Sequence, residues 1–144
     1  YNSKEAFDRE LISIIQQHGV ELIVLAGYMR VLTPLFVSHY FGKILNIHPS
    51  LLPKFPGLNT HQRAIDASEK VHGVSVHFVT KELDGGPLIC QESVIIDNLD
   101  TKETLSMKVL KKEHVIYPKV IHWYTQRRLN LIDDKTATLD GKII

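Results

Sequence analysis

With 144 residues, of which 44% are hydrophobic and 23% charged, the chain is long enough to bury the core of a single domain. Its 17 basic and 16 acidic side chains leave a net charge of +1, so electrostatics gives no reason to expect a nucleic acid or a membrane surface as a partner. The single cysteine, Cys90, cannot form an internal disulfide, and no apolar run approaches the roughly 20 residues of a transmembrane helix. These features favour the cytoplasm.

The first half of the chain alternates between helical and strand patterns. Apolar residues at helical spacing predict a helix that begins after Ser3 and stops at Gly19. The apolar run 22–26 predicts a short strand buried on both faces. Thr33, followed by proline, is typical of a helix start, and residues 43–47 predict a second strand. This strand–helix–strand order favours an α/β fold with parallel pairing.

The middle of the chain predicts a stiff loop and two further strands. A helix is expected over 60–70, followed by strands over 71–80 and 88–96. The connection between these strands is short enough for a hairpin-like return, so the sheet should be mixed. The loop before the helix is stiffened by Pro49, Pro53 and Pro56.

A long helix and a small hairpin are expected at the end of the chain. Asp100 and Glu103 match the spacing of a capping box, and Pro118 should kink or interrupt the helix that follows. Turn residues at 133–134 and 140–141 predict the hairpin. The apolar residues of this helix include Leu105, Val109, Val115, Ile116 and Val120.

Asn46 and His48 form a candidate site at the end of the second strand. Side chains two residues apart on a strand point to the same face, and ligands bind at the carboxyl ends of strands in open α/β sheets. The residues alone leave open whether His48 is functional or an ordinary hydrogen-bonded histidine. Asp84, which precedes two glycines, is either a turn residue or a carboxylate that approaches His48 and favours its charged form.

Other kinds of site have less support. His72 and His77 are five residues apart on a predicted strand and point to opposite faces, and no helix carries a zinc-binding motif, so no metal site is expected. Ser50 lies outside a Gly-x-Ser-x-Gly elbow, which argues against a serine hydrolase. No glycine-rich dinucleotide loop or Walker loop occurs.

Four segments carry a recognisable pattern, namely 25–32 (LAGYMRVL), 46–53 (NIHPSLLP), 56–61 (PGLNTH) and 77–80 (HFVT) followed by 83–87 (LDGGP). Together they resemble the phosphoribosylglycinamide formyltransferase family, over nearly the whole chain. The resemblance implies a Rossmann-like α/β fold with a mixed, mostly parallel sheet flanked by helices. It also implies that residues 1–144 are the C-terminal two thirds or so of a single catalytic domain, without its first βα units and their glycine-rich phosphate loop.

The resemblance also implies the residues of the site. Asn46, His48 and Asp84 would be catalytic. The folate-binding residues would be Met29, Arg30, Val31, Leu32, Asn46, Thr80, Lys81, Glu82, Leu83, Asp84 and, at a position that can carry arginine in relatives, Lys4. The amine substrate would contact Glu113, with Leu110, Lys111 and Lys112 as neighbours.

The implied reaction is formyl transfer from 10-formyltetrahydrofolate to the amine of glycinamide ribonucleotide in purine synthesis. It would need no metal, and it would be carried out by a monomer or a homodimer. Formyltetrahydrofolate deformylase is the nearest alternative, with water in place of the amine. A methionyl-tRNA formyltransferase is less favoured because the charge is near neutral. A truncated, inactive folate-binding module is the third alternative.

Overall fold

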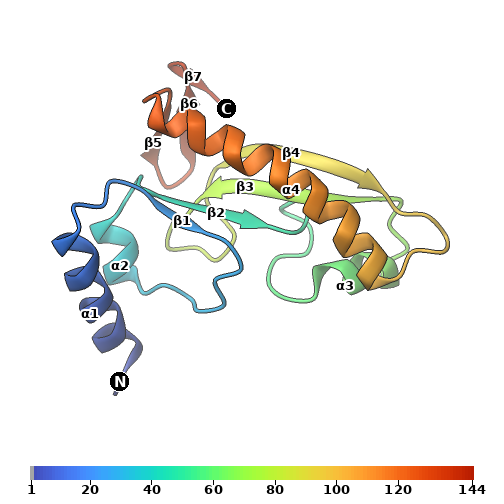
Figure 1. Ribbon diagram of the computed structural model, residues 1–144, viewed down its shortest axis with the longest axis horizontal. Helices are drawn as coiled ribbons and strands as arrows, with labels where there is room; N and C mark the ends of the chain where they lie inside the picture. Colours follow the sequence, from blue (N-terminus) through green and yellow to red (C-terminus); the bar gives the residue numbers. More distant parts are fainter. Residues whose placement is uncertain (1) are drawn as a thin grey trace.

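The computed structural model describes residues 2–144. Strands β1 to β4 form one sheet in that order, and β5 to β7 form a second, smaller sheet (Figure 1). The elements in chain order are α1 (Lys4–Gln17), β1 (Ile23–Leu25), α2 (Pro34–His39), β2 (Ile44–His48), α3 (Thr60–Asp66), β3 (Val71–Phe78), β4 (Leu88–Ile95), α4 (Lys102–Thr125), β5 (Leu129–Asp133), β6 (Thr136–Leu139) and β7 (Lys142–Ile143).

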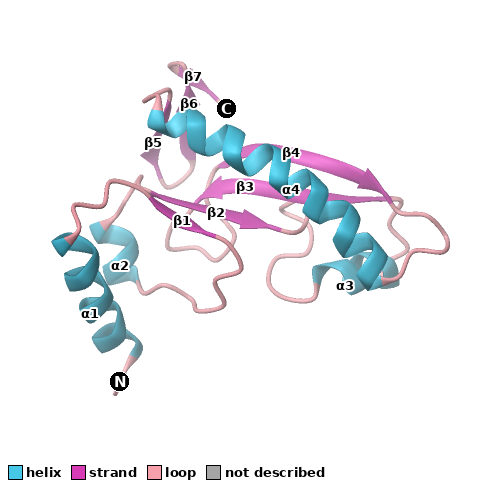
Figure 2. Cartoon of the chain, in the orientation of Figure 1, coloured by secondary structure: helices cyan, strands magenta, loops and turns pink. Residues whose placement is uncertain are grey.

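The larger sheet is mixed, as expected. β1 and β2, which are joined through α2, pair in parallel with Leu25 opposite Asn46. β3 pairs antiparallel with both β2 and β4, so the loop between β3 and β4 makes the hairpin-like return that the sequence predicts. Helices flank this sheet, and long loops connect its strands to the neighbouring elements (Figure 2).

The expectation that residues 22–26 form a strand buried on both faces is wrong for the described residues. β1 is an edge strand with a partner only in β2, and the Val24 side chain is 41% exposed. A continuous apolar run is typical of a strand in the middle of a parallel sheet, but an edge position leaves part of the run in contact with water.

The first two helices begin as the sequence predicts, and a buried carboxylate joins them. The Ser3 side chain accepts a hydrogen bond from the amide of Ala6, and Thr33 caps α2 in the same way. Asp8, which is 3% exposed on α1, accepts hydrogen bonds from the Thr33 amide at 2.8 Å and from the Thr33 hydroxyl at 2.7 Å. The contact fixes α1 against the start of α2, beside the loop that follows β1.

α4 packs across the larger sheet and also contacts the smaller one (Figure 1). Its buried side chains share one core with strands β2, β3, β5 and β6. The Tyr117 hydroxyl donates to the carbonyl of Leu25 at 2.5 Å and lies 3.2 Å from that of Leu45, so it ties α4 to β1 and β2. The fully buried members of the core include Leu45, Val74, Val76, Phe78, Leu105, Val109, Ile116 and Val120.

The expected capping box and the expected interruption of α4 need correction. The capping box is formed by Thr101 and Thr104, whereas the Asp100 carboxylate instead accepts hydrogen bonds from the Asp97 amide and the Lys108 ammonium. Pro118 does not interrupt the helix, which runs unbroken to Thr125. The Val115 side chain is 62% exposed, because its neighbour Ile116 takes the core-facing position.

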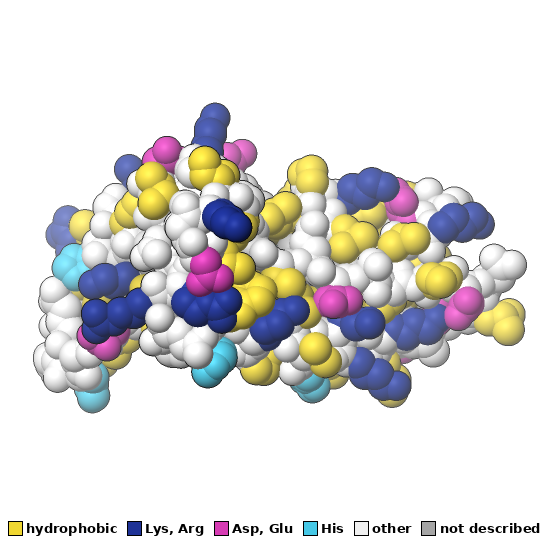
Figure 3. Space-filling view, turned by 90° about the horizontal axis from the view of Figure 1, so that it is seen from above, with side chains coloured by type: hydrophobic (Ala, Val, Ile, Leu, Met, Phe, Trp, Pro, Cys, Tyr) yellow, Lys and Arg dark blue, Asp and Glu magenta, His cyan; other side chains and the backbone are white. Residues whose placement is uncertain are grey.

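Two smaller differences concern the neighbouring segments. The helix expected over 60–70 ends at Asp66, since Ser68 adopts a positive φ of 54° that a right-handed helix cannot contain. The terminal hairpin gains a third strand, β7, which pairs with β6. Seen from above, basic, acidic and apolar side chains are interspersed over this side of the molecule (Figure 3).

Replacing Asp8 by alanine tests the contact between α1 and α2. Asp8→Ala leaves the Thr33 amide and hydroxyl without their acceptor in a buried position, which typically costs about 1–3 kcal/mol. We expect a loss of that size in the free energy of unfolding, measured by urea denaturation. Glu10→Ala, at an exposed position on the same helix, should stay within about 0.5 kcal/mol of the wild type. Equal effects of the two variants would contradict the role given to Asp8.

Candidate active site

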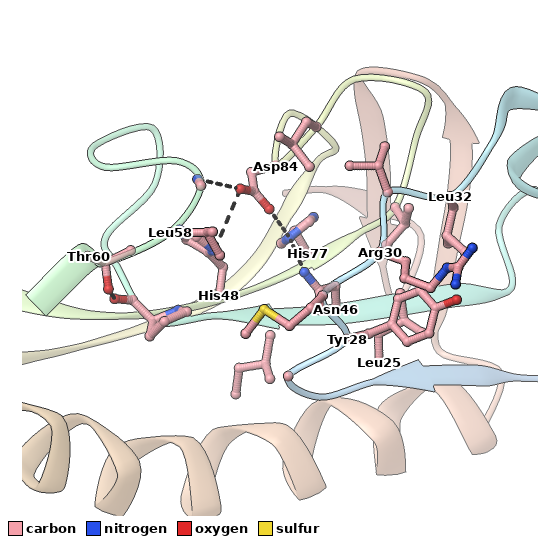
Figure 4. A pocket seen from close by; sticks show the side chains of 18 of the residues that line it. Leu25, Tyr28, Arg30, Leu32, Asn46, His48, Leu58, Thr60, His77 and Asp84 are labelled. Carbon is pink, nitrogen blue, oxygen red and sulfur yellow. Dashed lines mark hydrogen bonds and ion pairs between the residues drawn. The ribbon is translucent and has the colours of Figure 1, made fainter. Parts of the chain in front are cut away.

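Most of the residues predicted for the site line one cavity of about 490 Å³. Its walls come from the loop after β1, the end of β2 with the loop that follows it, and the loop between β3 and β4 (Figure 4). The lining residues are Leu25, 27–32, 46–49, 57–61, His77 and 79–84.

Asn46 and His48 both face this cavity, as their spacing on β2 predicts. The Nε2 atom of His48 lies 2.8 Å from the carbonyl oxygen of Phe55. Because a carbonyl can only accept, Nε2 carries a proton. The other ring nitrogen, Nδ1, lies 3.6 Å from the Asp84 carboxylate, close enough for an ion pair but beyond a hydrogen bond. Nδ1 is therefore the nitrogen that a substrate oxygen or a water can reach.

The Asp84 carboxylate contacts three separate parts of the chain (Figure 4). Its Oδ2 atom accepts a hydrogen bond from the Gly57 amide at 2.9 Å and is the oxygen nearest His48, while Oδ1 lies 3.9 Å from His77 Nε2. The side chain is only 8% exposed, so its charge is weakly screened by water. The structure thus brings Asp84 to His48, which the sequence left open.

The backbone conformation of the loop after β3 explains why aspartate stands at position 84 and glycine at position 86. Asp84 has a φ of 51°, a left-handed conformation that aspartate tolerates better than most side chains. A Cβ atom at Gly86 would lie 1.9 Å from the carbonyl oxygen of Phe78, so only glycine fits there. The Asp-Gly-Gly sequence is therefore what lets the loop fold tightly over the end of β3.

The loop after β2 is fastened to the sheet by Ser75 and Gln91. The Ser75 hydroxyl donates to the carbonyl of Ser50 at 2.7 Å and accepts from the amide of Leu52 at 3.0 Å. Gln91 Nε2 donates to the Leu52 carbonyl at 3.0 Å and to the Ser75 hydroxyl at 2.8 Å. These contacts fix the loop and with it the Phe55 carbonyl.

Ser50 does not act as a free hydroxyl. Its Oγ atom donates to the carbonyl of Lys54 at 2.6 Å, and the residue is fully buried. A proton held by a backbone carbonyl is not available to a general base, in keeping with the sequence argument against a serine hydrolase.

The structure separates the other predicted residues into two groups. Every predicted folate residue except Lys4 lines the cavity. Lys4 lies at the start of α1, and the α4 residues assigned to the amine substrate also lie outside the cavity lining. Lys112 pairs with Glu92 of β4 at 3.7 Å, and partial burial raises the pKa of Glu113. The residues outside the cavity lining are Lys4, Leu110, Lys111, Lys112 and Glu113.

Several lining residues went unassigned in the sequence, above all His77. The sequence places His77 in a motif but gives no sign that it lies opposite Asn46, because that depends on the register between β2 and β3. Tyr28 and the segment 57–61 also line the cavity. The prolines and glycine around that segment were the one signal that could have pointed to it.

A second pair of histidines joins His61, which lines the cavity, to His72, which lies outside the cavity lining. His61 Nδ1 is 3.1 Å from His72 Nε2, and His72 is only 1% exposed. Burial lowers the pKa of both rings, and for His72 to about 4. Among residues 2–144, no group of three or more histidine, cysteine, aspartate or glutamate side chains is placed to hold a metal ion. No helix in the same range is long and apolar enough to cross a membrane.

The fold and the cavity define a class of site. An amide, an imidazole and a carboxylate meet at the end of a strand in an α/β sheet, and such a set of donors and charges can stabilise a negatively charged oxygen. A family model described as formyl transferase matches residues 1–121. The chain therefore belongs to the formyl transferase family.

Individual relatives extend this comparison. The chain is 51% identical over 142 residues to a phosphoribosylglycinamide formyltransferase of Escherichia coli (strain K12), covering 99% of this chain and 66% of the relative. It is 48% identical to that of Haemophilus influenzae, covering 100% and 68%. The chain thus spans about two thirds of the length of the curated relatives it matches.

Solved structures agree with the fold. The phosphoribosylglycinamide formyltransferase of Coxiella burnetii superposes with a TM-score of 0.94 at 51% identity, covering 100% of this chain and 67% of that one. A formyltetrahydrofolate deformylase from Pseudomonas syringae pv. tomato superposes with a TM-score of 0.87 at 29% identity, covering 95% and 46%. The Rossmann-like formyltransferase fold expected from the sequence is confirmed.

The buried His72 should make stability depend on pH. Its pKa is about 4 in the folded state and about 6.5 when unfolded, so between these values the unfolded chain binds a proton that the folded chain does not. Stability contributed by the neutral ring is present above pH 6.5 and is lost as the pH falls toward 4. We expect His72 to account for about 1–2 kcal/mol of the loss between pH 7 and pH 5.

Urea denaturation of the wild type and of His72→Asn at these two pH values measures this contribution. The loss of unfolding free energy should be smaller in His72→Asn by that amount, whereas His122→Gln, at an exposed histidine of α4, should follow the wild type. A pH dependence that is unchanged in His72→Asn would show that His72 is not the group responsible.

Proposed function

We propose that the protein transfers a formyl group from 10-formyltetrahydrofolate to the amine of glycinamide ribonucleotide, a step of purine synthesis in the cytoplasm. The observation that carries the proposal is the meeting of Asn46, His48 and Asp84 in one cavity. The names of relatives about 50% identical to the chain support the choice of reaction.

The proposed chemistry begins with attack of the substrate amine on the formyl carbon. A carbon–nitrogen bond forms, and the formyl oxygen becomes a negatively charged oxygen in a tetrahedral intermediate. An N–H of Asn46 donates to that oxygen, and charged His48 acts through Nδ1, since its Nε2 proton is held by Phe55. The Asp84 carboxylate lies 3.6 Å from Nδ1, so its negative charge interacts favourably with the ring when the ring is charged.

Collapse of the intermediate releases the folate. The bond between the formyl carbon and the folate nitrogen breaks, and the proton lost by the amine is delivered to that nitrogen. Asp84 lines the cavity, where it can orient a water molecule for this transfer. No covalent intermediate with the protein is required.

The cavity offers two walls for the folate. One is the loop segment 29–32 and the other is the segment 80–84, and both border on Asn46 and His48. We propose that the formyl end of the folate lies against Asn46 and that its ring lies between these segments. The assignment of Glu113 and its neighbours on α4 to the amine, and of Lys4 to the folate, stays a prediction from the resemblance.

A deformylase is the second candidate, and the observation in its favour is the likeness to the Pseudomonas syringae enzyme. Its reaction would use water in place of the amine in the same cavity. The deciding assay follows consumption of 10-formyltetrahydrofolate by the chain with and without glycinamide ribonucleotide. Loss that depends on the amine supports the transferase, loss without it supports the deformylase, and binding without loss supports an inactive folate-binding module.

Substitution of the proposed catalytic residues tests their roles. His48→Ala and Asn46→Ala should each lower kcat for formyl transfer by about 10²–10³-fold, since each removes a group that stabilises the developing charge. Binding of the folate, followed by fluorescence titration, should weaken far less. His122→Gln serves as the control with unchanged kcat. Near-normal turnover of His48→Ala would remove His48 from the mechanism.

A further inference from the structure

His77 is a buried histidine of the cavity for which the chemistry described so far has no use. It lies opposite Asn46 in the register between β3 and β2, and it is only 2% exposed. Its ring lies next to the Asn46 side chain and below Asp84 (Figure 4). A polar ring buried at this depth needs partners for both nitrogens, and those partners reveal its protonation.

The hydrogen bonds of His77 select one tautomer. Its Nδ1 atom lies 2.8 Å from the carbonyl oxygen of Phe78, which can only accept, so Nδ1 carries a proton. Burial lowers the pKa of the ring, which favours its neutral form. Nε2 therefore has a lone pair, and its neighbour at 3.3 Å is the amide nitrogen of Asn46.

This arrangement also fixes the orientation of the Asn46 amide. An asparagine side chain has two orientations that exchange its oxygen and nitrogen. In the exchanged orientation, Asn46 Oδ1 would face the lone pair of His77 Nε2, and two acceptors would repel each other. Only the observed orientation gives a hydrogen bond, and it leaves the second N–H of the same nitrogen for a ligand.

We propose that His77 is a positioning residue, which accepts one N–H of Asn46 and thereby directs the other toward the formyl oxygen. The inference rests on the proposed function for the identity of that oxygen. It assigns no contact between His77 and the reacting atoms. The Phe78 carbonyl holds the ring from the far side, so a chain of two hydrogen bonds runs from the backbone of β3 to Asn46.

Spectroscopy of the chain without substrate tests the arrangement directly. Long-range ¹H–¹⁵N correlation spectra distinguish the tautomers of each histidine, and we expect His77 to carry its proton on Nδ1. The side-chain amide signals of Asn46, assigned by their disappearance in Asn46→Asp, should shift in His77→Phe and stay in place in His122→Gln. A proton on Nε2 of His77, or unchanged Asn46 signals in His77→Phe, would overturn the proposal.

Kinetics of the same variants measure the consequence. His77→Phe keeps a ring but has no acceptor, and we expect kcat to fall by about 10²-fold with little change in KM for the folate. His77→Gln can present its side-chain oxygen near the place of Nε2 and should recover most of that loss. A residue with only a structural role would lower thermal stability in both variants without this recovery, which would contradict positioning.

The two measurements separate this proposal from the proposed function. If the wild-type chain transfers no formyl group, the reaction assigned above fails, while the spectra still decide whether His77 orients Asn46. If His77→Phe does not fold, the tautomer in the wild type and the Asn46 signals in His77→Gln decide the matter. Retention of kcat in a folded His77→Phe would overturn the inference even where transfer is confirmed.

Discussion

The candidate site depends on where one carboxylate is held. Asp84 joins the loop after β2 through the Gly57 amide, β2 through His48 and β3 through His77. A buried carboxylate without partners would be costly, so the hydrogen bond from the Gly57 amide and the nearby His48 ring stabilise the loop that carries it. Gly86 lies too close to the Phe78 carbonyl to carry a side chain. Because glycine stands there, the loop can pass close to β3, and the Asp84 carboxylate lies near His48 and His77.

The remaining contacts of the cavity follow from rigid backbone. Ser75 and Gln91 hold the loop that supplies the Phe55 carbonyl, and that carbonyl in turn fixes His48. β3 thus serves the site in two ways, since Ser75 holds the loop after β2 and His77 contacts Asn46. The contacts that hold these donors come from the protein itself, and donors fixed in this way are those that contribute most to catalysis.

The sequence was most informative where structure is decided locally. The caps at Ser3 and Thr33 and the shared face of Asn46 and His48 depend on neighbours within a few residues, and all three are confirmed. The cap of α4 was misplaced by one residue because Asp100 and Thr101 are both good caps, and tertiary contact with Lys108 decided between them. The remaining features of the site depend on how the strands pair and in what order. No local pattern places His77 opposite Asn46, or shows that β1 lies at an edge.

The cavity also presents apolar side chains to water. Met29, Leu58 and Leu83 line it and are 77%, 71% and 61% exposed. A ligand that covers them removes hydrocarbon from water, and this change has a calorimetric signature, a negative heat capacity of binding. Since these contacts carry no charge, their share of the affinity depends little on ionic strength. The cavity therefore offers a ligand two kinds of contact, exposed hydrocarbon at Met29, Leu58 and Leu83, and the polar groups of Asn46, His48 and Asp84.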